Sequence, residues 1–201
     1  MKIEDLMIRN PITISPNTTI SEAIACMKTN SIRHLPVVAG DQRLLGFVTL
    51  ADLKQGLIPS MVGDLTLKDL MIKAPITVAP DQDIEIAAQL IYKHKIGGLP
   101  VVEDGKLWGI ITVTDLLGAF INMMGLLSAS SRVDVVLENQ PGSLKKAIQV
   151  VNDAGGDIIN IAMTAQKPGQ RVYYFRLTAC DTSTIRAALE AENYQVLATM
   201  G

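Results

Sequence analysis

Two short segments of the chain place an aspartate three residues after a threonine, from Thr49 to Asp52 and from Thr112 to Asp115. Each segment follows an apolar run typical of a strand and opens a pattern typical of a helix, so both side chains fall at a helix start. The unpaired N–H groups and the dipole of a helix N-terminus attract phosphate, to which a threonine hydroxyl can add a hydrogen bond. A carboxylate one turn further on can accept hydrogen bonds from the 2′- and 3′-hydroxyls of a ribose. The same spacing is that of an ordinary capping box, and for a single segment capping is the simpler interpretation.

Both segments belong to a long internal repeat, because residues 6–53 are written again at 70–116. The agreement includes the Leu-Pro-Val-Val run at 35–38, which returns at 99–102. Two copies of one supersecondary unit are expected to pack about a pseudo-two-fold axis, so the two Thr-x-x-Asp segments should face a shared cleft. The duplication therefore favours ligand contact over capping alone, although a threonine can serve both purposes more easily than an aspartate.

Each copy is predicted to fold as strand, helix, strand, strand and helix. Thr19 and Glu22 form a capping-box pattern in the first copy, and the helix that follows has one apolar face. The elements expected in this copy are a strand over 12–14, a helix with Ile20, Ala23, Ile24 and Met27 on its apolar face, a strand from Pro36, a turn over 39–42, a strand over 44–48 and a helix from Ala51. In the second copy, Asp104 and Gly105 make the hairpin turn and a helix begins at Thr114. Residues 56–63 link the copies.

The pattern changes after a linker rich in small residues at 126–131. The elements expected beyond it are strands over 133–137, 158–163, 172–178 and 196–199, a helix from Ser143 to the glycines at 155–156, a turn over 167–170 and a helix over 182–192. This order, βαββαβ, is that of a ferredoxin-like split unit, so the whole chain is predicted to be an α+β protein. We expect two repeats at 1–62 and 63–125, the linker, and a third domain at 132–201.

The repeated pattern of Pro-Ile-Thr, Leu-Pro-Val-Val and Gly, two apolar residues, Thr-x-x-Asp-Leu resembles a pair of cystathionine-β-synthase (CBS) domains. The last third, with Pro141 to Leu144 at a helix start and Gly155 to Ile158 leading into a strand, resembles an ACT domain. Together they are similar to the acetoin-utilisation accessory proteins. This resemblance implies a non-catalytic regulator that forms a homodimer, since both kinds of domain commonly dimerise and ACT domains often join their sheets side by side. It also implies a separate enzyme or regulator as the partner, because an output domain is not evident on this chain.

The resemblance further implies that an adenine nucleotide (AMP, ADP or ATP) binds between the repeats as a regulatory ligand. It assigns the ribose to Asp52 and Asp115 and the phosphate to Thr49 and Thr112. A dimerising adaptor without bound nucleotide is the alternative function.

Other residues of the repeats are weaker candidates for the nucleotide site. Thr13 and Thr77 would face the cleft if their apolar neighbours face the core, and the alternative is a solvent-facing strand threonine. Arg33 could steady a phosphate and His34 lies beside it, but each is also an ordinary surface or packed residue type. The second copy has glycines at these two positions, 97 and 98, which makes the two halves of the cleft unequal.

Two further features carry alternatives. Trp108 is expected to pack in the core, with adenine stacking as the second interpretation. In the last domain, the resemblance makes an amino acid the ligand, and the loop with Asn139, Gln140 and Gly142 could hold its carboxylate at the next helix N-terminus. The alternative is a turn whose Pro141 and Gly142 serve only geometry.

Composition excludes several classes of protein. A net charge of −2 gives no basic footprint for nucleic acid, and 48% hydrophobic residues indicate an ordered chain. The two cysteines, Cys26 and Cys180, form no CxxC pair, and the two histidines show no metal-ligand spacing, so we expect neither a metal site nor a catalytic centre. The N-terminus lacks the apolar core of a signal peptide, and the apolar stretch at 116–127 is too short to span a bilayer. We therefore expect a soluble, cytoplasmic protein.

Overall fold

The computed structural model describes residues 1–55, 65–127, 130–167 and 169–201. The chain forms two compact units, Met1–Leu117 and Gly118–Gly201. The division falls inside helix α6 (Val113–Met123), before the predicted linker at 126–131. Residues 128–129 of that linker, and the predicted link between the repeats at 56–63, lie outside the described residues.

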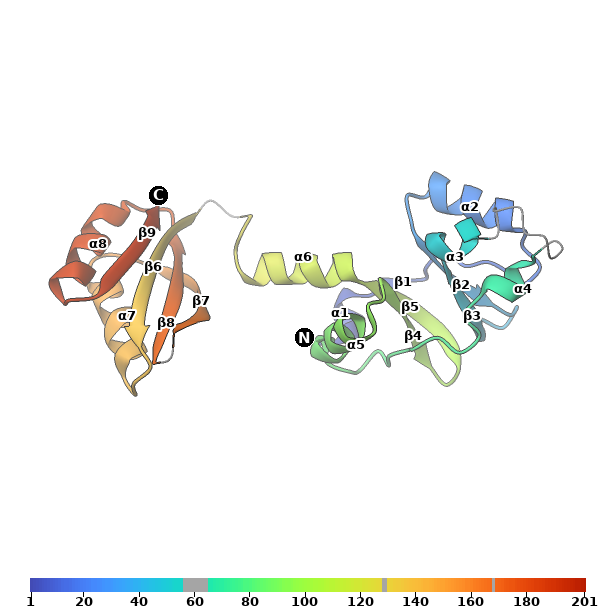
Figure 1. Cartoon of the computed structure of the whole chain (residues 1–201), viewed down its shortest axis with the longest axis horizontal. Helices are drawn as coiled ribbons and strands as arrows, with labels where there is room; N and C mark the ends of the chain where they lie inside the picture. Colours follow the sequence, from blue (N-terminus) through green and yellow to red (C-terminus); the bar gives the residue numbers. More distant parts are fainter. Residues whose placement is uncertain (56–64, 128–129, 168) are drawn as a thin grey trace. The chain divides into compact units, whose positions relative to one another are not determined.

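The first unit contains the two predicted copies (Figure 1). In the first copy the elements are α2 (Ile20–Thr29), β2 (His34–Val38), β3 (Leu44–Thr49) and α3 (Leu50–Gln55). In the second they are α5 (Ile84–His94), β4 (Gly98–Glu103), β5 (Lys106–Thr112) and α6. The predicted helices and hairpins are confirmed to within a few residues.

Helix α2 begins where its capping box predicts. The backbone N–H of Glu22 donates to Thr19 Oγ1 at 3.2 Å, and the N–H of Thr19 donates to the Glu22 carboxylate at 2.9 Å. Ala23 and Met27 are fully buried in the core of this copy, as the apolar face predicts.

The predicted first strand of each copy is reduced to one residue. Ile14 forms a single parallel bridge with Val37, and Val78 forms the corresponding bridge with Val101. The N–H of Ile14 donates to the carbonyl of Pro36, so Pro36 turns its missing N–H to this side and costs the β2–β3 ladder nothing.

The segments that lead into the two copies are exchanged between them. Helix α1 (Ile3–Leu6) and strand β1 (Ile8–Arg9) join the second copy, where β1 pairs with β5 and Ile3 is buried in the core. Helix α4 (Leu67–Leu70) joins the first copy, whose β3 forms two hydrogen bonds between Phe47 and Ile72 at 2.9 and 3.0 Å. The predicted boundary at 62/63 therefore does not divide the two folded copies, because each contains a segment from the other side of the boundary (Figure 1).

The two hairpins of the first unit meet at their turns. The N–H of Leu44 donates to the carbonyl of Gly105 at 3.1 Å, and the N–H of Leu107 donates to that of Gln42 at 2.9 Å. Gln42 and Gly105 are corresponding residues of the repeat, and both have positive φ (64° and 75°). This reciprocal pair of hydrogen bonds is what a pseudo-two-fold axis produces, as the duplication predicts.

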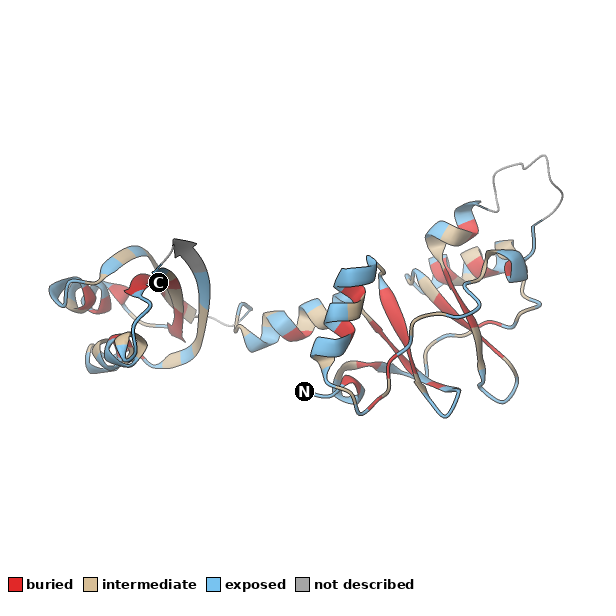
Figure 2. Ribbon diagram, turned by 60° about the horizontal axis from the view of Figure 1, so that its bottom comes forward, coloured by how far each residue is buried: buried red, intermediate tan, exposed pale blue. Residues whose placement is uncertain are grey.

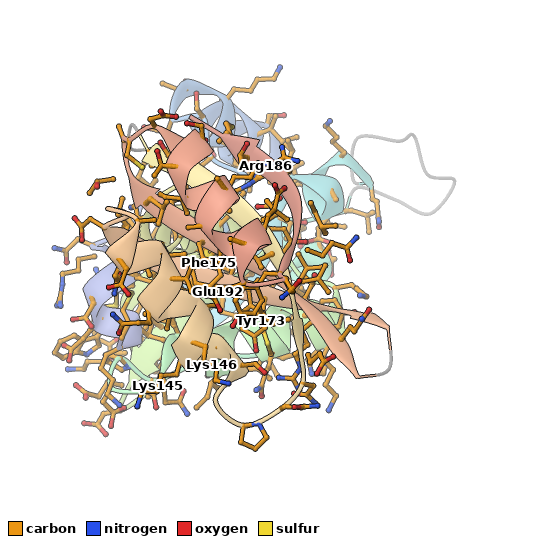
Figure 3. The ribbon with its side chains drawn as sticks, turned by 90° about the vertical axis from the view of Figure 1, so that its left-hand side faces the viewer. Lys145, Lys146, Tyr173, Phe175, Arg186 and Glu192 are labelled. Carbon is orange, nitrogen blue, oxygen red and sulfur yellow. The ribbon has the colours of Figure 1, made fainter. Side chains whose placement is uncertain are left out.

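The second unit has the predicted order of elements. They are β6 (Ser130–Glu138), α7 (Ser143–Asp153), β7 (Ile158–Lys167), β8 (Gln170–Thr178), α8 (Thr182–Ala191) and β9 (Gln195–Met200). The antiparallel sheet has the order β7-β8-β6-β9, so two split β-α-β units interleave. Both helices cover one sheet face, and Phe175 lies beneath them, fully buried (Figure 3). Buried residues line the inner sides of the helices and strands in both units (Figure 2).

Candidate functional site

The first unit contains a cavity of about 1170 Å³ that is partly open to solvent and is lined by both copies of the repeat. Thr49 and Asp52 reach it from the junction of β3 and α3, and Thr112 and Asp115 from the junction of β5 and α6. The prediction that the two Thr-x-x-Asp segments face a shared space is therefore confirmed at the level of position.

Both segments also form complete capping boxes. Oδ2 of Asp52 accepts from the Thr49 N–H at 2.9 Å and from the Thr49 hydroxyl at 2.7 Å. Oδ2 of Asp115 does the same with Thr112, at 2.8 and 2.7 Å. Oδ1 of each aspartate accepts no hydrogen bond from any residue that the structure describes. Capping thus leaves the other oxygen of each carboxylate available, so the capping and ligand-binding interpretations are compatible.

Unlike Oδ1 of the aspartates, the hydroxyls of Thr49 and Thr112 already take part in hydrogen bonds. An ionised carboxylate can only accept, so each threonine must direct its hydroxyl proton to the aspartate. Donation from Thr49 or Thr112 to a phosphate, as predicted, would require breaking that hydrogen bond. The cationic side chains that line the cavity could contact a phosphate without that cost.

Thr13 and Thr77 are not among the described residues that line the cavity. Their neighbours Ile12 and Ile76 line it instead, and Ile12 is 40% exposed while Ile14 is buried. In the first copy the condition under which Thr13 would face the cleft is therefore not met. In the second copy Ile76 packs against the core and Val78 is buried, yet Thr77 is not among the described lining residues. The reason is that a single residue of each segment, Ile14 or Val78, is bridged to a strand, so the strict alternation of a longer strand does not hold.

Arg33 and His34 both line the cavity. The His34 ring stacks on Phe47, with the ring centroids 5.8 Å apart. A Cβ atom added at Gly97 would lie 2.6 Å from His34 Nε2, so the imidazole of the first copy occupies the space that a side chain of the second would need. The copies differ in sequence here because they touch: the His34 side chain of the first copy packs against Gly97 of the second.

The environment of His34 makes the stability of the protein sensitive to pH. Burial, together with the neighbouring Arg33, lowers the pKa of His34 below its ordinary value of 6.5, and Asp52 opposes this shift. Because the unfolded chain then binds more protons than the folded one as the pH falls below that value, stability is lost there. Above it, His34 is neutral in both states and contributes nothing.

We therefore expect the wild-type protein to lose more unfolding free energy than a His34→Gln variant between neutral pH and about pH 5.5. Urea unfolding at a series of pH values measures this difference. Parallel profiles of the two proteins would contradict it.

Several lining residues were not predicted from the sequence. Lys54 and Lys95 add two cationic side chains to Arg33 in a cavity that is also lined by Asp52 and Asp115. Lys95 lies at a left-handed backbone position (φ 56°), and the corresponding residue of the first copy, Ser31, has φ 53° and also lines the cavity. A comparison of the two copies just after the ends of α2 and α5 could have found Ser31 and Lys95. The apolar residues Ile8 and Ile72, 49% and 43% exposed, line the same cavity.

The expected core position of Trp108 is wrong. It is 43% exposed and lines a separate depression of about 430 Å³ with Arg9 and Lys106. The register between β4 and β5 shifts between Val101 and Val102, which leaves Trp108 as the unpaired residue of a β-bulge. A bulge redirects the side chain that it carries, here into solvent.

The candidate amino-acid loop lies at the surface of the second unit. Asn139, Gln140 and Gly142 are all exposed, and Gly142 is the N-cap of α7 with φ 90°. The N–H of Asn139 donates to the carbonyl of Gly169 at 2.9 Å, so the backbone of this loop is joined to the connection between β7 and β8. The helix that follows has no side-chain cap and no acidic residue in its first turn.

Two searches of the described residues concern other classes of site. Among them, no three His, Cys, Asp or Glu side chains lie close enough to hold a metal ion. No helix in the described part of the chain is long and apolar enough to cross a bilayer.

Comparison with known proteins decides the family of the first unit. The family model described as CBS domain matches residues 3–58 and 67–122, which is more than half of the chain. The chain belongs to the CBS-domain family. The matched ranges coincide with the two copies of the repeat, so the cavity lies between two CBS domains.

The similar solved structures cover the CBS pair of this chain. A putative acetoin utilization protein (AcuB) from Vibrio cholerae is 36% identical, with a TM-score of 0.56 over 63% of this chain and 94% of that one. The CBS domain pair of protein MJ0100, in complex with 5′-methylthioadenosine and S-adenosyl-L-methionine, is 29% identical, with a TM-score of 0.57 over 61% and 97%. CBSX2 in complex with AMP is 28% identical, with a TM-score of 0.54 over 61% and 97%.

The curated relatives are mostly much longer than the matched region. The inosine-5′-monophosphate dehydrogenase of Methanocaldococcus jannaschii is 38% identical over 119 residues, which are 58% of this chain and 23% of that enzyme. The chain thus spans about a quarter of this relative, and the likeness concerns the CBS region.

Proposed function

We propose that the CBS pair of this chain is a regulatory module that binds an adenosine-containing nucleotide in the cavity between its two domains. The observation that carries the proposal is the pair of carboxylates, Asp52 and Asp115, whose Oδ1 atoms have no partner among the described residues of a shared cavity. A carboxylate oxygen can accept hydrogen bonds from the hydroxyls of a ribose, as carboxylates do in dinucleotide sites. That relatives of the same family hold adenosine compounds supports this assignment.

The rest of the cavity suits the remaining parts of such a ligand. Ile8, Ile12 and Ile72 offer apolar surface to an adenine ring. Arg33, Lys54 and Lys95 offer charge to a phosphate tail, and the planar fork of Arg33 matches a phosphate in two places. Arg33 and His34 belong to the first domain alone, so we propose that the two halves of the cavity bind unequally.

The proposal extends to the second unit and to the context of the protein. We propose that its four-stranded sheet is a ferredoxin-like ACT domain, that the loop with Asn139, Gln140 and Gly142 binds an amino acid, and that the chain forms a homodimer. We further propose a cytoplasmic, non-catalytic protein that signals to a separate enzyme or regulator, with a role in acetoin utilisation suggested by the likeness to AcuB.

A thermal unfolding screen tests the nucleotide proposal. AMP, ADP, ATP, S-adenosylmethionine, 5′-methylthioadenosine and NAD are each added to the whole chain. A ligand at a hundred times its dissociation constant stabilises the folded state by about 2.7 kcal/mol. If none of these compounds raises the unfolding temperature, the proposal is wrong and a purely structural adaptor is the better description.

The role of Arg33 can be separated in the same assay. An Arg33→Gln variant should lose about tenfold or more in affinity for AMP, because a charge-assisted pair with phosphate is lost. Its affinity for 5′-methylthioadenosine, which has no phosphate, should stay near the wild-type value. Equal losses for both ligands would contradict the assignment of phosphate to Arg33.

A further inference from the structure

A buried arginine in the second unit has no carboxylate partner. Arg176 lies on β8 between Phe175 and Leu177, which face the helices, so Arg176 points to the opposite side of the sheet. It is only 8% exposed. Its Nη1 donates to the Ser130 hydroxyl at 2.6 Å, which uses one of the five N–H donors of a guanidinium. No other residue that the structure describes accepts from it.

The neighbours of Arg176 on this face do not compensate its charge. Arg132 is directly opposite on β6, and like charges in cross-strand positions are unfavourable. Asp134, on the same face of β6, is already engaged by Arg132, with Nε–Oδ1 and Nη2–Oδ2 distances of 2.9 and 3.1 Å. The three charged groups thus leave one positive charge in excess.

An unsatisfied acceptor lies on the other neighbouring strand. Asn160 on β7 is paired in register with Arg176. Its Nδ2 donates to the carbonyl of Met123 at 2.9 Å, which fixes the orientation of the amide, and its buried Oδ1 has no partner in the described part of the chain. Buried groups without partners are costly and demand an explanation. Here unused donors and an unused acceptor occur on adjacent strands and do not satisfy one another.

We propose that this sheet face binds a small carboxylate, held in a bidentate manner by Arg176 and completed at Asn160. A carboxylate matches the planar fork of a guanidinium and would neutralise the excess charge. An ammonium group next to that carboxylate, as in an α-amino acid, would in addition donate to Asn160 Oδ1. The face reaches solvent beside Arg132, whose side chain is 37% exposed. The site is distinct from the adenosine cavity and from the loop at 139–142.

Thermal unfolding of the whole chain tests the site directly. Glycine, L-alanine, lactate and pyruvate are compared with chloride at equal ionic strength. We expect at least one carboxylate to raise the unfolding temperature of the second unit saturably, by about 5 °C. A larger rise with alanine than with lactate and pyruvate indicates that Asn160 is used, and equal rises indicate Arg176 alone. No rise above that with chloride overturns the proposal.

Variants separate ligand binding from a structural role. Arg176→Met should abolish the response, while the unliganded protein unfolds at no lower temperature, because an uncompensated buried charge is removed. The matched control is Arg186→Met on the outer surface of α8 (Figure 3), where Arg186 pairs with Glu190 at 2.8 Å, and it should keep the response. A response that survives Arg176→Met overturns the site.

A second pair of variants supplies the missing carboxylate from the protein itself. Asn160→Asp and Asn160→Leu both lose the hydrogen bond to Met123, but only the aspartate can pair with Arg176. We expect the Asp variant to unfold at a higher temperature than the Leu variant and to ignore added carboxylates. If the two variants unfold alike, the excess charge at Arg176 is not real and the proposal fails. AMP is proposed to bind in the first unit, so substitutions at Asn160 should leave its affinity unchanged. A failure of the carboxylate site is therefore distinguishable from a failure of the nucleotide proposal.

Discussion

An Asp52→Asn or Asp115→Asn protein should bind adenosine compounds about ten- to a hundredfold more weakly than wild type, with little loss of stability. The amide oxygen of asparagine can accept the two hydrogen bonds from the threonine that Oδ2 accepts now, so the helix cap is kept. The other position changes from a charged acceptor to an NH₂ donor. A ribose diol therefore loses its acceptor while the protein keeps its fold, and calorimetric titration measures the difference.

The chain contains its own control for this experiment. Thr66 and Asp69 form a capping box of the same geometry, with hydrogen bonds of 2.9 and 2.6 Å, but neither lines the cavity. Asp69→Asn should leave nucleotide affinity unchanged. If all three variants bind as the wild type does, the aspartates serve only their helices and the ribose assignment is wrong. A loss in only one of the cavity variants would identify the half of the cavity that is occupied.

A Gly109→Ala protein should be destabilised by about 1–3 kcal/mol. A Cβ at this position would lie 2.8 Å from the backbone oxygen of Ile8 and 2.7 Å from the sulfur of Met7. The methionine can move, but the carbonyl belongs to β1, which pairs with β5 at this point. The strand must shift, and Ile8 shifts with it in the wall of the cavity, so nucleotide affinity should fall as well. Urea unfolding and titration measure the two effects.

The repeat provides a graded comparison for this prediction. At Gly46, the corresponding residue of the first copy, a Cβ would lie 3.1 Å from the oxygen of Ile72, so Gly46→Ala should cost less. Gly40 has no atom within 4 Å of its would-be Cβ, and Gly40→Ala should unfold like the wild type. Equal stability of the Gly109 and Gly40 variants would show that the exchanged strand is not tightly held against β5.

Local signals in the sequence predicted much of the fold. The Thr19 capping box, the apolar positions of α2 and the Asp104-Gly105 turn each depend on a few adjacent residues, and each appears where expected. The duplication did more for the site than any single motif, because it placed Thr49-Asp52 and Thr112-Asp115 on one cavity.

What the sequence could not show depends on contacts between distant segments. The segments around Met7 and Met71 have the same pattern, so nothing local indicates that each completes the other copy. Trp108 is exposed because of a register shift between two strands, which alternation of residue types does not reveal. The isolation of Arg176 arises only when β6, β7 and β8 set Arg132 and Asn160 on either side of it.

The exchanged lead segments have a consequence for how the CBS pair is made. The first domain is not complete until residues 67–72 have been synthesised, and the second is completed by residues 3–9, which precede the first domain. During synthesis the core of the first domain therefore stays incomplete until helix α4 has been made. Helix α1 likewise stays unpacked until the second copy has been made. A single domain cut from this protein would lack one helix and one edge contact, which only another copy could provide, as in a domain-swapped dimer. In this chain both copies lie on one polypeptide, so each receives its exchanged segment from within the same molecule.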